Sequence, residues 1–133
     1  MILLDTHALI WLVLGSERLG TMARDRCQEM VRTGSAFVSA VSFWEIAILV
    51  RKNRFQLAIS PAAWREGVLS QGIVEVPLDG VTAAEAPALP DFHADPADQF
   101  IVATAIRSNA ALLTADERIL EWRGQLARQD ARL

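Results

Sequence analysis

The chain has 133 residues, of which 52% are apolar, and a formal net charge of −3. This size fits a single domain, spanning residues 1–133, with a sizeable core. The longest unbroken apolar run, residues 8–14, is far shorter than the roughly 20 residues that a membrane-spanning helix requires. Because no basic segment precedes the first apolar residues, we expect a cytoplasmic protein with no membrane partner.

Two further features of the composition limit the classes of function. The lone Cys27 excludes an internal disulfide and a zinc site built from several cysteines. The negative net charge does not favour nucleic-acid binding by the molecule as a whole, so such a role requires a local basic patch. Arg51, Lys52 and Arg54 form a candidate cluster, although scattered basic residues of this kind are usually ordinary solvated surface.

Segments with strand and helix patterns alternate along the chain. In chain order, we predict a strand at 2–4, helices at 6–14 and 21–34, a strand at 36–40, helices at 42–52 and 60–71, a strand at 73–78, helices at 81–86 and 96–108, a strand at 111–114 and a helix at 116–122. The polar segment 123–133 has no clear pattern. This alternation predicts an α/β domain with a mainly parallel sheet that helices cover on both faces.

Residues typical of helix N-termini stand at several predicted boundaries. Thr21, Ser42, Asp95 and Thr114 are candidate N-caps, and Ser42 forms a capping-box pattern with Glu45. Asp95 precedes a proline, which is favoured at the first helical position, so we read Asp95 as the cap of its helix.

Four acids, Asp5, Glu45, Asp98 and Asp116, follow predicted strands closely. Each acid alone is explained by the preference for negative charge in a first helical turn. Neighbouring parallel strands would, however, bring all four to one edge of the sheet, where two unit charges about 4 Å apart repel by about 4 kcal/mol at an intermediate dielectric. A hard divalent cation removes this penalty, and carboxylates are the ligands that Mg²⁺ or Mn²⁺ selects.

The segments that hold these acids carry a resemblance to a known family. They read LLDTHALIWL, VSAVSFWEIAILVRKNRF, HADPADQFIVATAI and LLTADERI, in that order. The chain resembles PIN-domain endoribonucleases of the kind that serve as toxins in VapBC-type toxin-antitoxin pairs. The resemblance implies a three-layer α/β/α sandwich around about five strands, a metal ion held among Asp5, Glu45, Asp98 and Asp116, an RNA substrate, a cognate antitoxin and a homodimer.

The expected chemistry follows from that metal. An ion bound by Asp5 and Asp98 can lower the pKa of a bound water and offset charge on the phosphoryl oxygens, while Glu45 and Asp116 complete the cage, bind a second ion or orient the water. Attack on a phosphodiester would leave a 5′-phosphate and a 3′-hydroxyl. Thr6 and Thr114 are possible supporting residues, because a hydroxyl can bind a ligand as well as a backbone amide.

Several departures and alternatives bear on this interpretation. Gln99 stands where related toxins often carry arginine, so we expect no phosphate contact from that position. His7 and His93 are not needed as general bases if the water is bound to metal. A phosphatase of the haloacid-dehalogenase type would need an aspartate in place of His7, and no glycine-rich phosphate loop is present. The surviving alternative is a noncatalytic α/β interaction module whose acids cap helices.

Overall fold

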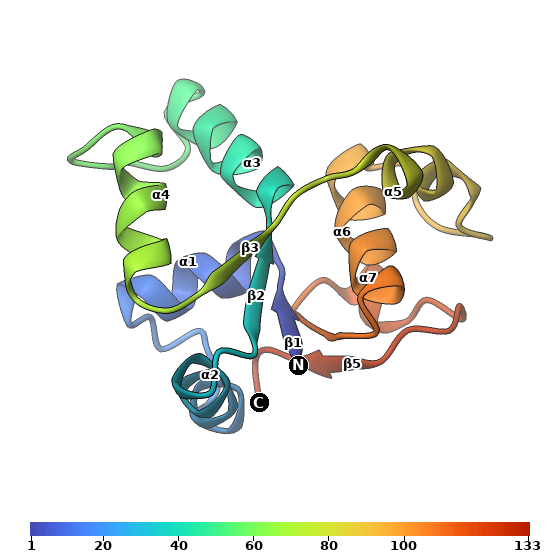
Figure 1. Ribbon diagram of the computed structural model, residues 1–133, viewed down its shortest axis with the longest axis horizontal. Coiled ribbons are helices and arrows are strands. Elements are labelled where there is room, and N and C mark those ends of the chain that lie inside the picture. Colours follow the sequence, from blue (N-terminus) through green and yellow to red (C-terminus); the bar gives the residue numbers. More distant parts are fainter.

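The computed structural model describes residues 1–133, and its centre is a sheet of five parallel strands in the order β3-β2-β1-β4-β5 (Figure 1). The strands are β1 Ile2–Leu4, β2 Ala36–Ser39, β3 Val74–Val76, β4 Ala111–Thr114 and β5 Arg128–Asp130. The register places Leu4 of β1 beside Val38 on one side and Leu113 on the other. The prediction of a mainly parallel sheet is confirmed.

Helices cover both faces of this sheet, as Figure 1 shows. The helices are α1 Thr6–Leu14, α2 Thr21–Arg32, α3 Ala40–Arg51, α4 Pro61–Ser70, α5 Gly80–Glu85, η1 Ala86–Ala88, α6 Pro96–Arg107 and α7 Glu117–Leu120. Helices α1, α2 and α4 lie on one side, and α5, α6 and α7 lie on the other. Helix α3 continues past the end of β2 and contacts α1 and α4 as well as α6. The predicted three-layer α/β/α arrangement is confirmed. None of these helices combines the length and apolarity needed to cross a bilayer.

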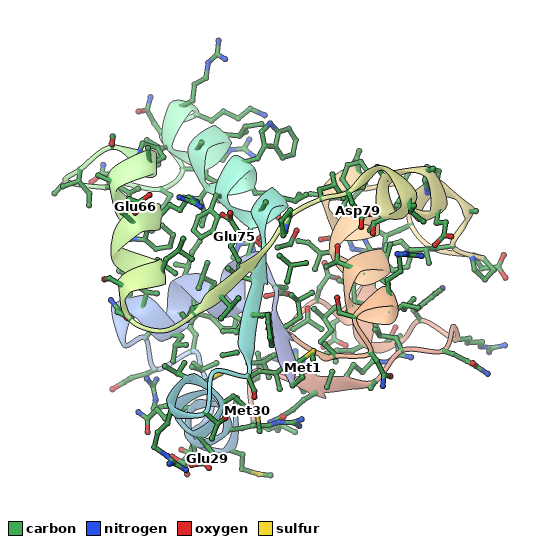
Figure 2. All side chains as sticks on the ribbon, in the orientation of Figure 1. Met1, Glu29, Met30, Glu66, Glu75 and Asp79 are labelled. Carbon is green, nitrogen blue, oxygen red and sulfur yellow. The ribbon has the colours of Figure 1, made fainter.

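Successive residues of β1 point into two separate cores. Ile2 and Leu4 belong to the larger core, and Leu3 belongs to the smaller one. All three are almost fully buried, because a strand in the middle of a covered parallel sheet has apolar neighbours on both faces. Figure 2 shows side chains filling the space on both sides of the sheet, whereas the labelled Glu29 and Glu66 lie on the outside.

Two predicted N-caps are wrong by a few residues. Helix α2 begins at Thr21 with Gly20 as its N-cap, and a Cβ on Gly20 would lie 2.1 Å from the backbone of Leu133, so the packing of the C-terminal segment requires glycine there. Helix α3 begins at Ala40, and the side chain of Ser39 accepts from the amide of Val41. The sequence offers two serines three residues apart, and the helix starts at the one that ends β2.

The structure also changes the prediction for the last third of the chain. Asp116, and not Thr114, is the N-cap of α7, since its carboxylate accepts from the amide of Arg118. Strand β5 was not predicted, because its residues Arg, Gln and Asp are polar and only half-buried at the edge of the sheet. The cap predicted at Asp95 is confirmed, and Ser60 caps α4, which begins with Pro61.

Candidate active site

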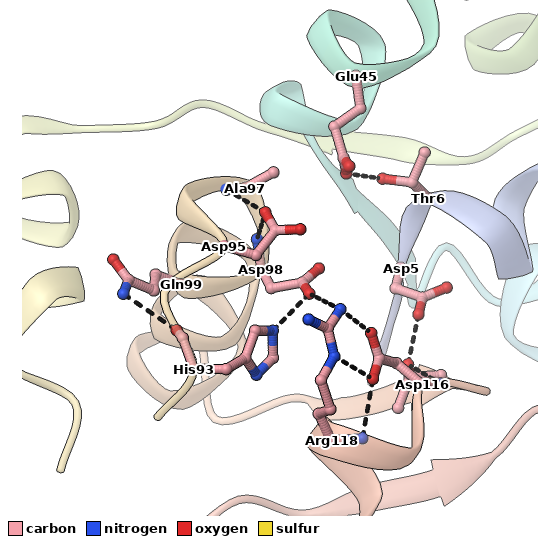
Figure 3. A network of polar contacts seen from close by, with 11 residues as sticks. Asp5, Thr6, Glu45, His93, Asp95, Ala97, Asp98, Gln99, Asp116 and Arg118 are labelled. Atoms are coloured by element: carbon pink, nitrogen blue, oxygen red, sulfur yellow. Dashed lines mark hydrogen bonds and ion pairs between the residues drawn. The ribbon is translucent and has the colours of Figure 1, made fainter. Parts of the chain in front are cut away.

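An acidic pocket of about 280 Å³ opens at the carboxyl edge of the sheet. It is lined by Asp5, Thr6, His7, Trp11, Glu45, Asp95, Asp98, Ala115, Asp116 and Arg118. The four acids singled out in the sequence all line this one pocket, although they come from four separate segments of the chain. Figure 3 shows these side chains directed toward one another from β1, α3, α6 and the end of β4.

Asp5 is the most buried acid of the pocket, at 7% exposure. It follows β1 directly, and one carboxylate oxygen caps α1 by accepting from the amide of Ala8 at 2.8 Å. The other oxygen accepts a hydrogen bond from the hydroxyl of Thr114, at the end of β4. The Thr114 hydroxyl oxygen in turn accepts from the amide of Asp116 at 3.1 Å. Thr114 therefore connects two of the predicted site acids.

Glu45 reaches the pocket from the second turn of α3. Its carboxylate accepts from the hydroxyl of Thr6, which is also hydrogen bonded to the hydroxyl of Ser42 at 2.9 Å. Ser42 is completely buried. The residue that we predicted as an N-cap therefore fixes Thr6, and Thr6 fixes Glu45.

Asp98 lies in the first turn of α6, where Asp95 caps the helix by accepting from the amides of Ala97 and Asp98. One oxygen of Asp98 lies 2.7 Å from Nε2 of His93. The backbone carbonyl of His93 accepts from the side-chain amide of Gln99 at 3.2 Å. Gln99 thus holds the loop that carries His93, which is a role the sequence did not indicate.

Arg118 introduces a positive charge among these acids. Its guanidinium donates to Asp116 at 3.0 Å and to Asp98 at 3.5 Å, while 58% of its side chain remains exposed. Sequence reasoning missed Arg118 as a site residue and set His93 aside as a general base that was not needed. His93 lies in the loop before α6 and Arg118 in the first turn of α7, so neither stands at a strand end.

Burial shifts the protonation of the pocket acids. It raises the pKa of Asp5 to about 6, although the hydrogen bonds from Thr114 and Ala8 oppose the change. Burial likewise raises the pKa of Glu45 to about 7, with repulsion from neighbouring acids adding to it. Burial also raises the pKa of Asp98, but the pKa of Asp116 falls because hydrogen bonds from Arg118 outweigh its burial. Crowded carboxyls of this kind are typical of functional sites.

The donor set fits a hard divalent cation. One ligand atom from each of His93, Asp98 and Asp116 lies within 4.8 Å of the others. Asp5 and Glu45 lie outside this trio but line the same pocket, so oxygen ligands predominate. Carboxylate oxygens suit Mg²⁺ and Mn²⁺, whereas imidazole is a more usual ligand of Zn, Cu, Fe and Ni.

Helix capping does not account for the whole cluster. Asp5, Asp95 and Asp116 accept from backbone amides at helix N-termini. Glu45 and Asp98 accept instead from the side chains of Thr6, His93 and Arg118. The alternative in which every acid is only a cap therefore fails for two of the four predicted site residues.

A parallel α/β sandwich with acids gathered at the carboxyl ends of its strands defines a class of protein, and comparison with known families identifies it. The model of the PIN domain family matches residues 2–124. The chain belongs to the PIN domain family.

Individual relatives agree with this assignment. The chain is 36% identical over 123 residues to Ribonuclease VapC22 of Mycobacterium tuberculosis, with 92% of each chain covered. Its fold is similar to that in a toxin-antitoxin complex from Klebsiella pneumoniae, with a TM-score of 0.66, 18% identity and 98% of each chain covered. It is also similar to FitAcB from Neisseria gonorrhoeae, with a TM-score of 0.56, 20% identity and coverage of 87% of this chain and 88% of that one.

Proposed function

We propose that this protein is a metal-dependent endoribonuclease that hydrolyses RNA phosphodiester bonds in the cytoplasm. The observation that carries the proposal is the gathering of Asp5, Glu45, Asp98 and Asp116 in one pocket. The identity to Ribonuclease VapC22 supports RNA as the substrate class. We assign Mg²⁺ as the ion, with Mn²⁺ able to replace it, because the ligands are mostly carboxylate oxygens.

In this proposal Asp98 and Asp116 hold the ion together with Asp5 and Glu45. A bound divalent cation would lower the pKa of a water and offset negative charge on the phosphoryl oxygens. Arg118 offers the exposed part of its guanidinium to the phosphate of the RNA. Thr114 and Thr6 hold Asp5 and Glu45 in place through their hydroxyls. Cleavage leaves a 5′-phosphate and a 3′-hydroxyl.

The test is cleavage of a mixed RNA pool by the purified protein with Mg²⁺ and with EDTA. Asp98→Asn should reduce the rate about 100-fold or more, because one oxygen ligand of the pocket is lost. Asp25→Asn is the matched control, since Asp25 is exposed on α2 and remote from the pocket. Metal-dependent cleavage that only Asp98→Asn abolishes supports the nuclease. Equal activity in all three preparations would indicate a contaminant, and binding of Mg²⁺ without any cleavage would require another function.

We also propose that the protein acts as a toxin with a cognate antitoxin. The fold likeness to a toxin-antitoxin complex supports such a partner. An acidic pocket with an exposed rim suits a partner that brings an arginine and an apolar helix. Copurification of a small protein from the native source, with loss of nuclease activity in the complex, is the expected result.

A homodimer is the assembly that we propose for the free toxin. Large apolar side chains are exposed, including Leu14, Met22 and Trp44 at 59%, 67% and 55%. A homodimer that covered such side chains would remove apolar surface from water. Sedimentation equilibrium measures the mass directly, and a monomer at micromolar concentration would contradict this part of the proposal.

A further inference from the structure

A second hollow lies beside the acidic pocket. It measures about 430 Å³ and is lined by Asp91, His93, Arg118, Glu121, Trp122 and Arg123 among others. We call it the side hollow. Arg118 lines both spaces, so its side chain lies between the acidic pocket and the side hollow. A chain of RNA whose phosphate lies at Arg118 would therefore place an adjoining nucleotide in the side hollow.

The walls of the side hollow are held firmly. The indole N–H of Trp122 donates to the carbonyl of Pro90 at 2.8 Å, which joins the 90–93 loop to the segment after α7. Arg128 donates to the carbonyls of Ile119, Trp122 and Gly124 at 2.6, 2.7 and 2.9 Å. These bonds fix the segment that carries Arg123. The side hollow is thus a formed site and not a gap between loose loops.

Its chemistry combines cations, acids and aromatic rings. Arg123 is exposed and takes part in none of the ion pairs of the structure. Asp91 and Glu121 offer exposed carboxylates on the same walls. The indole of Trp122 also lines the side hollow but is only 8% exposed, and one face of the His93 ring is covered by Phe92, with the ring centroids 4.3 Å apart. Recognition therefore depends on the charged groups, because arginines bind phosphates and carboxylates accept from the exocyclic amino groups of bases.

We propose that the side hollow binds the nucleotide next to the scissile phosphate. Arg123 contacts its phosphate, and Asp91 or Glu121 accepts from the amino group of its base. The side hollow therefore favours cytosine over uracil, which has a carbonyl where cytosine has an amino group. This inference rests on the proposed nuclease function for its biological meaning, but the binding itself can be measured separately.

The test is a titration of the native protein with cytidine 5′-monophosphate and with uridine 5′-monophosphate, followed by NMR. The reporter is the assigned indole N–H signal of Trp122, and EDTA keeps trace metal from drawing the phosphate into the acidic pocket. We expect the cytidine nucleotide to shift this signal at a lower concentration than the uridine nucleotide. Arg123→Ala should weaken binding about 10-fold, because one charged hydrogen-bond partner is lost. Arg18→Ala is the control, since Arg18 is exposed in the loop between α1 and α2 and lines neither space.

A second measurement connects the side hollow to catalysis. On an RNA that the native protein cleaves, Arg123→Ala should raise KM about 10-fold with kcat unchanged, because it removes binding and not chemistry. Equal shifts with both nucleotides, or shifts that survive Arg123→Ala, would overturn the proposal. A protein that binds cytidine 5′-monophosphate here but cleaves no RNA would refute the nuclease and keep the site. If the protein cleaves RNA but neither nucleotide shifts the Trp122 signal, the side hollow site is refuted and the nuclease is kept.

Discussion

Glu45 couples the stability of the metal-free protein to pH. Its pKa is raised from 4.5 to about 7 by burial, so the folded state binds a proton more tightly than the unfolded chain does. The stability that this proton confers is fully present below about 4.5 and is lost as the pH rises through about 7. Glu45→Gln keeps an acceptor for Thr6 but cannot ionise. We expect native protein and variant to be similarly stable at mildly acidic pH, and the variant to be more stable above neutrality.

Urea denaturation in EDTA on both sides of this pH range measures the effect. The native protein should lose free energy of unfolding relative to Glu45→Gln as the pH rises. Asp5 changes in the same direction in both proteins, because its own pKa is raised to about 6, so the comparison isolates Glu45. A difference between the two proteins that is independent of pH would contradict the assigned burial of this carboxyl.

Thr114 is the single hydroxyl that holds Asp5 and the start of the Asp116 loop together. Thr114→Val keeps the shape of the side chain but removes both bonds in a fully buried position. We expect unfolding to become easier by about 1 to 3 kcal/mol and metal affinity to fall about 10-fold or more. Calorimetric titration with Mn²⁺ and urea denaturation give the two values.

Thr104→Val provides the matched control for this change. Thr104 is also buried, and its hydroxyl donates to the carbonyl of Phe100 within α6. It touches none of the pocket acids. A similar loss of metal affinity in both variants would mean that Thr114 acts through general stability and not by holding Asp5.

The sequence predicts the four acids of the site, but it does not predict the basic side chains that contact them. Asp5, Glu45, Asp98 and Asp116 follow parallel strands or begin the next helices, so the topology alone indicates that they meet. His93 lies in a loop whose course no periodicity describes, and Arg118 lies in the short helix α7, where no sequence pattern indicates that it reaches Asp98. Their bonds to Asp98, at 2.7 and 3.5 Å, depend on the packing of α6 against the segment after β4.

At the scale of elements, the C-terminal edge of the sheet depends on Arg128. Its guanidinium donates to carbonyls of Ile119, Trp122 and Gly124 and lies 6.0 Å from the ring of Trp122. Arg128→Ala leaves the carbonyls of Trp122 and Gly124 without a donor, whereas the Ile119 carbonyl keeps its bond from the Trp122 amide. We expect the free energy of unfolding to fall by about 2 to 3 kcal/mol, because several hydrogen bonds to a charged group are lost together.

Arg132→Ala is the comparison, since Arg132 makes ion pairs with Asp130 and Glu117 on the surface and is 46% exposed. Exposed pairs of this kind contribute about 1 kcal/mol or less. Urea denaturation of both variants ranks the two arginines. Equal losses would contradict the structural role assigned to Arg128.

Four of the five strands were predicted from the sequence, and the missing one is β5 at this edge of the sheet. Strands β1, β2 and β4 are buried on both faces and consist mainly of apolar residues, so a search for hydrophobic runs finds them. Strand β5 pairs only with β4 and holds polar residues that are half-buried. Its position is set by hydrogen bonds such as that of the Leu112 amide to the Ala127 carbonyl, and a backbone bond has no sequence signature. The N-caps of α2 and α3 also differ from the predicted ones: they are Gly20, which packs against the C-terminal residues, and Ser39 at the end of β2.

For the whole molecule, the sheet separates two cores that must form together. Leu4 lies in the larger core and Leu3 in the smaller, and both are fully buried. Replacement of either by alanine should cost about 2 to 5 kcal/mol, a large part of the roughly 5 to 15 kcal/mol typical of a domain. Val81→Ala, at a 51% exposed position, should change the stability by less than about 0.5 kcal/mol.

The unfolding of the two core variants also tests cooperativity. We expect single transitions that coincide by fluorescence and by circular dichroism, because β1 contributes to both cores. If Leu3→Ala loosened one face while the other stayed folded, the two probes would separate and the cores would be independent.

The hydrogen bond between Thr114 and Asp5 joins residues that are 109 positions apart. During synthesis, Asp5 leaves the ribosome long before Thr114 and Asp116 are translated. A ribosome that stalls before residue 114 therefore releases a fragment in which β1 has no β4 beside it and the carboxylates are incomplete. If the proposed nuclease is correct, its pocket is assembled only after Asp116 has been translated, so products truncated before that residue should cleave no RNA.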